Sequence, residues 1–350
     1  MTSPATDAIC LITGGAGFIG SHLCDALLQS GQRIVVLDDL STGSRENLST
    51  SGSPAGNIPI EQIRLGDPDT GPLRELFDRW QPRTICHLAA QSSVARSMRA
   101  PERDAASNLL GTIQLLEQAR RCRVERFLFA STGGAIYGNV AGPAREDHPP
   151  APRSAYGLSK WACEQYLQLY ARNWLPSVVV LRYANVYGSR QDPLSETGVI
   201  ATFCSALLQG QPARIMGSAR ISRDFIHVTD VVRATCLALQ SPQLASGLHC
   251  FNVGTGQPTR LEELLQQIAS LLQQSWPTDP CAPELSASGS TEKAAVLPDP
   301  LFELIDPRPG DLSASVLDCR RMADQLGWQA QIDLRSGLQQ TLDWYRSRPR

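Results

Sequence analysis

The sequence predicts an α/β protein, with a doubly wound parallel sheet and a smaller C-terminal domain interwoven with it. Three observations lead to this fold class. Apolar runs of strand length alternate with helical stretches as far as about residue 185. The first run is followed at once by a glycine-rich turn and a helical pattern. From residue 186 onward the alternation loosens, and proline and loop signals become more frequent.

The first unit of this pattern predicts a dinucleotide site in a Rossmann-type fold, rather than a merely structural glycine turn. Residues 8–12 form an apolar run of the buried parallel-strand kind, and a helical pattern runs from Ser21 to Gln29. The glycines between the strand and the helix carry no side chain, so the backbone can approach a pyrophosphate at the helix N-terminus, where free amides favour negative charge. Two spacings fit the turn: GxGxxG at Gly15, Gly17 and Gly20, and GxxGxxG at Gly14, Gly17 and Gly20.

A second strand, residues 33–37, supports the same site. It ends at Asp38, within the ~20-residue interval expected for the carboxylate that holds an adenosine ribose. Asp38 and Asp39 together would repel a 2′-phosphate. The predicted cofactor is therefore NAD rather than NADP.

Further strands are expected at residues 62–65, 84–88, 126–130 and 177–181, separated by helices such as 107–121 and 155–172. In a doubly wound sheet, ligands bind outside the carboxyl ends of the strands. Chemistry is therefore expected just after each run. The residues found there are Asp67, Ala89 to Gln91, Ser131 and Thr132, and Tyr183 to Asn185.

The chain is expected to divide into two domains. Residues 1–185 would form the cofactor-binding domain, and residues 226–256 would return to it through a helix and a strand. Residues 186–225 and 257–350 would form the substrate domain. Within it, residues 276–300 are rich in Pro, Ser and Ala and are expected to form a mobile loop.

Composition indicates a soluble enzyme with a large core, since 42% of the residues are hydrophobic. The net charge of −2, without a basic run, argues against nucleic acid or an anionic membrane surface as a partner. The first residues lack the pattern of a signal peptide, so a cytoplasmic location is expected. The ten cysteines are scattered without a CxxC pair or a Cys/His cluster, and neither a metal site nor a disulfide is expected.

Lysine is scarce in this chain, which makes its position informative. Only two of the 32 basic residues are lysine, and one of them, Lys160, stands four residues after Tyr156. An ammonium is a compact point charge, whereas guanidinium is planar and forked, so position 160 indicates a need for an amine. The alternative is an ordinary pair on a helix surface. The other lysine, Lys293, lies in a loose Pro/Ser/Ala stretch and looks incidental.

A series of motifs resembles the extended short-chain dehydrogenases/reductases, and within them the UDP-glucose 4-epimerase group. The motifs follow in family order over nearly the whole chain. They are Thr13–His22, Leu37–Gly43, His87–Ala90, Ser131–Gly138, Tyr156–Lys160, Leu181–Gly188, Arg223–Val228 and Arg308–Asp311. The resemblance implies an NAD site made by Gly14, Gly17, Phe18, Ile19, Gly20, Asp38, Asp39, Ser41, Thr42, Gly43, Asp67, Leu88, Ala89, Ala90, Tyr156 and Lys160.

The catalytic roles follow from the chemistry of a sugar hydroxyl, which needs a base to remove its proton as it is oxidised. Tyr156 would be this base, and Lys160, one helical turn away, would stabilise its phenolate. The resemblance implies that Lys160 also holds the nicotinamide ribose. Thr132 falls on the family's catalytic Ser/Thr when matched from Phe129. An extra glycine before Tyr137 leaves both Thr132 and Ser131 open as proton relays. The alternative is a strand-end pair that only caps the next turn.

The reaction expected from the resemblance is C4 epimerisation of a UDP-hexose through a transient 4-keto intermediate. Related dehydratases and decarboxylases carry acidic residues where this chain has Gly133 and Gly134. Two other functions stay open. One is another sugar-nucleotide enzyme of the superfamily: a 4,6-dehydratase, a decarboxylase or a different epimerase. The other is a non-catalytic NAD-binding sensor or scaffold.

Substrate contacts are also implied by the resemblance. Asn185, Arg223 and Arg308 would bind the diphosphate, and Asp311 the nucleotide ribose. A small residue at Ser315, where some epimerases carry Tyr, predicts tolerance of UDP-GlcNAc and UDP-GalNAc. The family further implies a homodimer formed through a helix pair. The alternative is that Tyr166, Leu169 and Tyr170 of the helix 155–172 are ordinary core residues. Val199 and Ile200 are expected in the nucleotide site, with Val199 where some epimerases place a uracil-contacting Asn.

Overall fold

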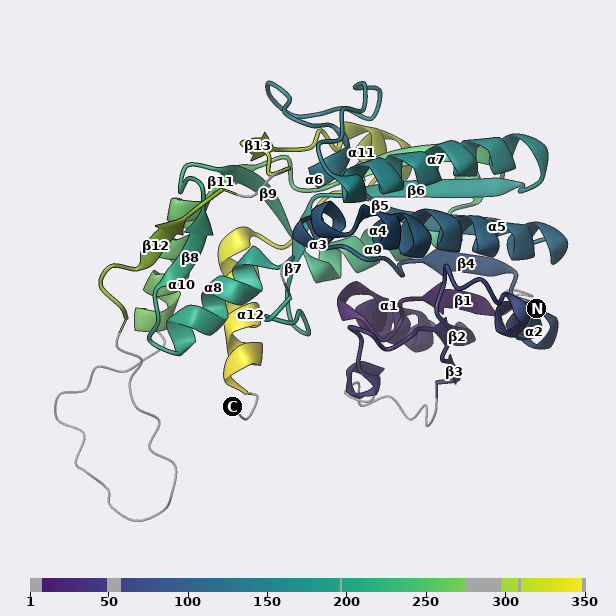
Figure 1. Ribbon diagram of the computed structural model, residues 1–350, viewed down its shortest axis with the longest axis horizontal. Coiled ribbons are helices and arrows are strands. Elements are labelled where there is room, and N and C mark those ends of the chain that lie inside the picture. Colours follow the sequence, from purple (N-terminus) through teal and green to yellow (C-terminus); the bar gives the residue numbers. More distant parts are fainter. Residues whose placement is uncertain (1–7, 49–57, 196, 275–296, 308–309, 348–350) are drawn as a thin grey trace, which may run out of the picture.

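The computed structural model describes residues 8–48, 58–195, 197–274, 297–307 and 310–347. Its centre is a seven-stranded sheet in the order β10-β6-β5-β4-β1-β2-β3, and all neighbouring strands are parallel (Figure 1). The strand order reverses between β1 and β4, as in a doubly wound sheet. The strands are β1 (Cys10–Thr13), β2 (Ile34–Leu37), β3 (Ile60–Glu61), β4 (Thr84–His87), β5 (Arg126–Thr132), β6 (Ser177–Tyr183) and β10 (Gly247–Val253).

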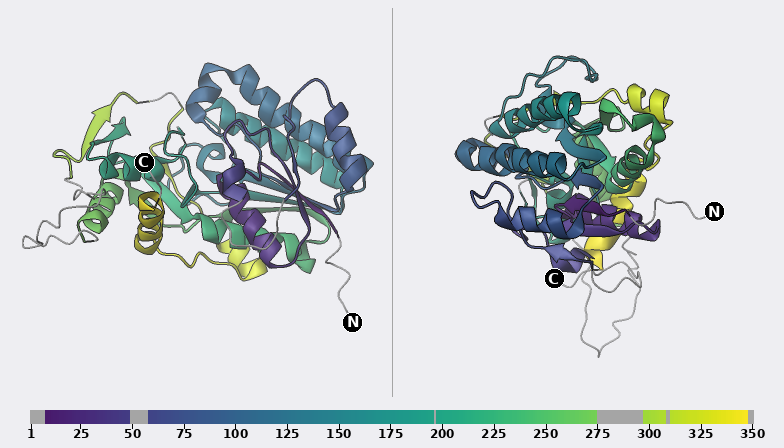
Figure 2. Two further views of the ribbon diagram at one scale, coloured as in Figure 1. Left: turned by 90° about the horizontal axis from the view of Figure 1, so that it is seen from below. Right: turned by 90° about the vertical axis from the view of Figure 1, so that its right-hand side faces the viewer.

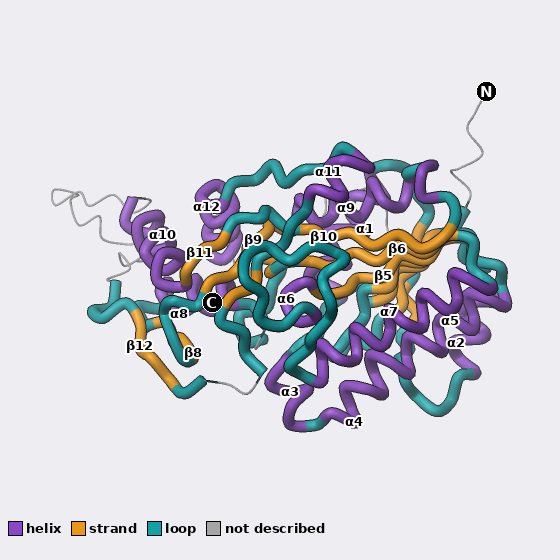
Figure 3. Tube along the Cα trace, turned by 90° about the horizontal axis from the view of Figure 1, so that it is seen from above, coloured by secondary structure: helices purple, strands orange, loops and turns teal. Residues whose placement is uncertain are grey.

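Helices cover both faces of this sheet, which explains the apolar composition of its strands. Successive side chains alternate between the faces, so Cys10 and Ile12 join one core cluster whereas Leu11 joins the other. Figure 3 shows α1, α9 and α11 on one side and α2, α5 and α7 on the other. Their bounds are α1 (Phe18–Gln29), α2 (Gly71–Trp80), α5 (Gly111–Arg121), α7 (Ala155–Asn173), α9 (Val228–Gln240) and α11 (Arg320–Leu326).

Short helical segments connect these elements. A π-helical turn, η2, joins α4 to α5, and such turns occur frequently at functional sites. The predicted helix 107–121 is therefore one part of a longer helical run that starts at Pro101. The short segments are η1 (Arg45–Leu48), α3 (Val94–Arg99), α4 (Pro101–Asp104), η2 (Ala105–Leu110), α6 (Gly133–Ile136) and η3 (Pro242–Leu244).

A second group of elements lies beside the carboxyl end of the large sheet and has its own core cluster (Figure 2). It contains a sheet in which β9 pairs with β7, β11 and β13, and a two-stranded sheet of β8 and β12. The elements are β7 (Asn185–Tyr187), α8 (Val199–Leu208), β8 (Ala213–Met216), β9 (Ser222–His227), β11 (Pro258–Arg260), α10 (Leu261–Gln274), β12 (Phe302–Ile305), β13 (Ala314–Ser315) and α12 (Leu334–Arg346).

The predicted fold class is confirmed, with one strand displaced. The strand expected at residues 62–65 is β3, two residues earlier, because only Val36 and Leu37 of β2 offer it partners. The chain then leaves the sheet, and Arg64 reaches the exposed side of Asp39. The division of the chain into two domains at the predicted bounds stays a prediction. Residues 276–296 of the expected mobile loop lie outside the described residues.

A buried ion pair joins two layers of the fold. Arg182 of β6 and Glu164 of α7 approach to 2.5 Å, with their side chains only 5% and 6% exposed. Ser131 of β5 donates a hydrogen bond to the same carboxylate, and Tyr137 accepts one from the guanidinium. Two charges out of water are tolerated only when every polar atom is satisfied in this way.

Replacing Arg182 by methionine (R182M) should therefore lower the free energy of unfolding by about 3–5 kcal/mol, since Glu164 would remain buried without its partner. Urea denaturation followed by circular dichroism measures this loss. The matched control is R79A, which breaks an ion pair between Glu61 and an Arg79 that is 63% exposed. It should cost less than about 1 kcal/mol. Equal losses of unfolding free energy in the two variants would show that the buried ion pair contributes no more to stability than the exposed one.

Candidate active site

The glycine turn after β1 is shaped for the close approach of a ligand. Gly14 has a φ of +70°, and a Cβ built there would lie 2.7 Å from the Ala89 nitrogen. A Cβ on Gly20 would lie 2.1 Å from the Gly14 oxygen. Helix α1 starts at Phe18 without a side-chain cap, so its first amides are free to face a pyrophosphate. The turn therefore fits the predicted dinucleotide.

Asp38 closes the other side of this turn. Its carboxylate is 6% exposed and accepts hydrogen bonds from the backbone amides of Ala16 and Leu40, both at 2.9 Å. Burial raises the pKa of Asp38, and these two bonds oppose the rise. Asp39 points to the surface, where it pairs with Arg64 at 3.2 Å. The two neighbouring carboxylates thus face different surroundings, and only Asp38 belongs to the turn.

The other residues of the predicted NAD site lie around the same edge of the sheet. A Cβ on Gly43 would meet the Ala16 carbonyl carbon at 2.8 Å, so the segment with Ser41 and Thr42 packs on the glycine turn. Leu88 and Ala89 hydrogen-bond to Thr13, which places the end of β4, with Ala90, beside the end of β1. Two of the predicted residues, Phe18 and Ile19, pack partly into the core, and Asp67 lies exposed in the turn after β3.

The structure brings Tyr156, Lys160 and Thr132 together. Burial raises the pKa of Tyr156 well above 10, and the charge of Asp104 adds to this rise. The neighbouring Thr132 side chain opposes the rise. The phenol therefore stays protonated at neutral pH unless further positive charge stabilises its anion.

Lys160 lies in a dry environment behind Tyr156. Only 3% exposed, it donates a hydrogen bond from Nζ to the Ala130 carbonyl at 2.8 Å, and Nζ lies 4.5 Å from the centre of the Phe129 ring. Burial lowers the pKa of Lys160 to about 8, although Cys163, Asp104 and Glu164 oppose this change. The carbonyl and the ring give the buried ammonium partial compensation. A guanidinium in this position would bring five donors in a rigid fork, more than these two partners can satisfy.

Ser131 and Thr132, which the sequence left open as alternatives, have different partners. The Ser131 hydroxyl donates a 2.6 Å hydrogen bond to Glu164 and is buried in the ion-pair network of Arg182. Thr132, and not Ser131, affects the pKa of Tyr156. Sequence reasoning missed Glu164, although its position four residues after Lys160 on the same helix face was a readable signal.

A neighbouring histidine is held neutral. His87 of β4 is buried between the hydroxyls of Thr13 and Thr112, at 2.7 and 3.0 Å from its ring nitrogens. Burial lowers its pKa to about 3, and the positive charge of Lys160 contributes to this shift. His87 therefore adds no second cation beside Lys160 at neutral pH.

On the opposite side of the site, Asn185 and the two glycines after Thr132 lie together. A Cβ on Gly134 would be 3.7 Å from the Thr132 hydroxyl and 3.9 Å from the Asn185 amide, which is ordinary contact. A Cβ on Gly133 would lie 2.5 Å from the buried side chain of Leu317, which fills this space. Asn185 also donates to the Asp224 carbonyl at 3.2 Å.

The predicted substrate residues are only partly brought together. Arg223 and Ser315 are paired across β9 and β13, and the Arg223 guanidinium donates to the carbonyls of Ser222 and Leu312 at 2.9 and 2.7 Å. Burial lowers the pKa of Arg223, and the exposed Asp311 opposes this. The remaining three differ in placement: Val199 starts α8, the Ile200 side chain lies in the core of the second group, and Arg308 is outside the described residues.

The described ranges contain neither a metal-binding cluster nor a membrane-spanning helix. No three His, Cys, Asp or Glu side chains there are grouped so that they could hold a metal ion. No helix in the same ranges has the length and apolar character needed to cross a membrane.

Known proteins resemble this chain over nearly its whole length. A UDP-glucose 4-epimerase from Mycolicibacterium smegmatis is 39% identical, over 97% of this chain and 98% of that protein. The crystal structure of a Thermus thermophilus UDP-glucose 4-epimerase with NAD is 38% identical, with a TM-score of 0.82 over 97% of this chain and 99% of that one. A Thermotoga maritima UDP-glucose 4-epimerase with UDP-glucose is 37% identical, with a TM-score of 0.82 over 97% and 98%.

The family model that matches this chain covers the residues of the candidate site. Residues 10–254 match the family model described as the NAD dependent epimerase/dehydratase family, a range that includes the glycine turn, Thr132, Tyr156 and Lys160. The chain therefore belongs to the NAD dependent epimerase/dehydratase family.

Proposed function

We propose that this protein is a UDP-hexose 4-epimerase that interconverts UDP-glucose and UDP-galactose through a transient 4-keto sugar. The observation that carries the proposal is the contact of Tyr156 with Thr132 beside the buried Lys160, followed by two glycines instead of acidic residues. Relatives and solved structures that match nearly the whole chain are named UDP-glucose 4-epimerases, which supports the same reaction.

In this proposal the glycine turn and Asp38 hold NAD, which supplies reversible hydride acceptance at the sugar C4. Tyr156 removes the proton of the 4-hydroxyl, and Thr132 hydrogen-bonds the same oxygen. The ammonium of Lys160 stabilises the Tyr156 phenolate, which burial would otherwise prevent from forming. The 4-keto sugar then turns over in the site, the opposite face of C4 would take back the hydride, and Tyr156 returns the proton to the C4 oxygen, which gives the epimer.

The surroundings of Gly133 and Gly134 favour epimerisation over the dehydratase and decarboxylase alternatives. Elimination of water from C5 and C6 needs an additional acid and base. Leu317 fills the space at position 133, and position 134 carries no side chain although a Cβ would fit there. The residues close to Thr132 can therefore move one proton at C4 but offer no second acid.

Substrate anchoring is proposed for the side of the site formed by β7, β9 and β13. Asn185, Arg223, Arg308 and Asp311 would hold the nucleotide diphosphate and ribose, as forked guanidinium donors suit phosphate oxygens. Ser315, in register with Arg223, would leave room for an N-acetyl group on the sugar.

We also propose a cytoplasmic homodimer. The described cysteines are all free thiols, as is typical of a reducing compartment.

On α7, the side chains of Leu158, Tyr166 and Leu169 are 57%, 39% and 47% exposed, and Leu110 of the adjacent η2 is 43% exposed. An apolar stripe of this kind on neighbouring helices is a typical interface, and a second copy of the same helix pair would cover it.

The Y156F variant should lower kcat by about 10³-fold, because the base is lost while binding is kept. T132A should lower kcat by about 10²-fold, and S131A by less than about 10-fold, since Ser131 faces Glu164. Conversion of UDP-glucose followed by NMR measures these rates. Full turnover by Y156F would remove the assigned base, and a larger loss in S131A than in T132A would reverse the assignment of the relay.

The substrate range can be tested with a panel of UDP-, dTDP- and GDP-sugars, with the products identified by NMR. UDP-glucose and UDP-GlcNAc should both be epimerised at C4. The S315Y variant should lose UDP-GlcNAc turnover by at least about 10-fold and keep UDP-glucose turnover, because only the larger sugar needs the space. A 4-keto-6-deoxy product or released CO₂ would refute epimerisation, and wild-type protein inactive on UDP-GlcNAc would refute the role of Ser315.

The dimer can be tested by light scattering after size-exclusion chromatography. L169E should convert the dimer to a monomer, because a carboxylate cannot be buried in an apolar interface without a partner. L304E is the matched control, since Leu304 of β12 is 59% exposed and lies outside this stripe. A monomeric wild-type protein, or an unchanged mass in L169E, would contradict the proposed interface.

A further inference from the structure

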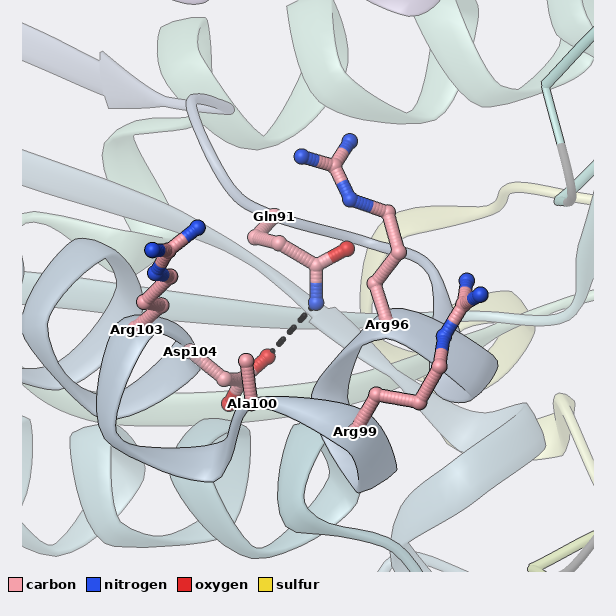
Figure 4. A pocket seen from close by; sticks show the side chains of 6 residues that line it. All are labelled: Gln91, Arg96, Arg99, Ala100, Arg103 and Asp104. Carbon is pink, nitrogen blue, oxygen red and sulfur yellow. Dashed lines mark hydrogen bonds between the residues drawn. The ribbon is translucent and has the colours of Figure 1, made fainter.

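A buried carboxylate that the proposed mechanism does not use lies close to the catalytic helix. Asp104 ends α4, where the chain passes into the π-helical turn η2, and it is 1% exposed. Its oxygens accept three hydrogen bonds, from the Gln91 amide at 2.8 Å, the Asn108 amide at 3.1 Å and the Ser159 hydroxyl at 2.6 Å (Figure 4 shows the first). All three donors are neutral side chains.

One side of this network fixes the turn that follows β4. The Gln91 backbone amide donates to Asn108 at 2.8 Å, and Asn108 donates back to the Gln91 carbonyl at 2.9 Å. Gln91 also binds Ser93 through both ends of its side-chain amide. This turn continues directly from Leu88 to Ala90, which lie beside the glycine turn. Asp104 thereby holds a segment of the cofactor edge.

The other side of the network reaches the catalytic residues. Ser159 lies on α7 between Tyr156 and Lys160, and its bond to Asp104 joins positions 55 residues apart in the chain. The negative charge of Asp104 raises the pKa of both Tyr156 and Lys160. Burial is the larger cause for each group, and for Lys160 it acts in the opposite direction.

The other ionisable groups around Lys160 are Cys163 and Glu164 of α7 and His87 of β4. Burial raises the pKa of the Cys163 thiol and lowers that of His87, so both are neutral near pH 7. Glu164 is paired with Arg182 of β6. Asp104 is therefore the negative group near Lys160 whose charge no bonded cation cancels.

A cavity of about 250 Å³ opens over Gln91 and Asp104 (Figure 4). Its remaining lining comes from Ala100 and from Arg96, Arg99 and Arg103, whose side chains are exposed. Guanidinium groups in contact with water screen a buried charge only weakly compared with a bonded partner. The three arginines therefore offset the negative charge of Asp104 less than a bonded cation would, and the charge still acts on α7.

We propose that Asp104 is a positioning residue of the active site: its buried carboxylate joins the turn after β4 to the catalytic helix at Ser159. Its negative charge also favours the protonated amine of Lys160. This proposal rests on the proposed function, because Tyr156 and Lys160, on which Asp104 acts, are the catalytic residues of that function. The same negative charge opposes the phenolate of Tyr156, so Asp104 should set the pH range of the reaction as well as its geometry.

The D104N variant separates charge from geometry. Its amide oxygen can accept from Gln91 and Asn108, and its NH₂ can donate to the Ser159 hydroxyl, so only the charge is lost. Removing a negative charge lowers the pKa of both Tyr156 and Lys160. Both limbs of the kcat profile against pH should therefore move to lower pH, by about one unit. Loss of packing alone would lower kcat without moving both limbs together, and unmoved limbs in D104N would overturn the proposal.

Two matched variants complete the set. E102Q removes an exposed carboxylate from the same helix, and its profile should equal that of the wild type. S159A keeps the charge of Asp104 and breaks only the 2.6 Å bond. It should leave both limbs in place and lower kcat by about 10-fold with KM unchanged, because the helix is less well positioned. Full activity in S159A would overturn the positioning part of the proposal.

A direct measurement is possible because the chain has only two lysines, Lys160 and Lys293. Protein labelled with ¹³C at lysine Cε should give two signals by NMR, and the K293R variant assigns them. Lys160 should titrate near pH 8 in the otherwise unchanged protein and about one unit lower with D104N. An unchanged titration would overturn the inference whatever the substrate is. A shifted titration in a protein without epimerase activity would refute only the proposed function.

Discussion

The removal of Lys160 from water is the constraint on which the rest of the site depends. A buried ammonium loses its hydration, and this loss lowers its pKa toward the pH at which the protein works. The fold compensates by several means at once: the Ala130 carbonyl, the face of the Phe129 ring and the negative charges of Asp104 and Glu164. Arginine is the usual cation of this chain, but its fork of five donors would need more buried partners than these.

The neighbouring polar groups are arranged so that this one positive charge is not duplicated or cancelled. His87, between two threonine hydroxyls, is kept neutral. Glu164 is shared among Lys160, Ser131 and Arg182, and the bond with Arg182 takes up most of its charge. A low dielectric makes every unpaired charge costly, so a buried ammonium can persist only where the surrounding groups are paired or neutral. The site and the core of the large sheet are consequently stabilised by the same side chains.

Another buried carboxylate, Asp224 of β9, fixes the chain segments beside Gly133. It accepts bonds from the backbone amides of Thr255, Gly256 and Leu317 and from the Thr255 hydroxyl. Through the amide of Leu317 it holds in place the side chain that fills the space beside Gly133. The absence of an acidic residue after Thr132 is therefore built into the packing as well as into the sequence. A side chain at position 133 would collide with Leu317, so the packing of the core keeps this position free of an acidic group.

The sequence alone determined the parts of this protein that depend on local geometry. The glycine turn needs a residue without Cβ at Gly14, because the Ala89 nitrogen just after β4 lies 2.7 Å from where that atom would stand. The Tyr156–Lys160 spacing follows from the pitch of one helix. Only the tertiary structure separated Thr132 from Ser131, brought Asp104 to Ser159, and set Leu317 against Gly133. Desolvation and Coulomb interactions depend on distance in space, and the folded chain decides which distant residues come close enough to shift a pKa.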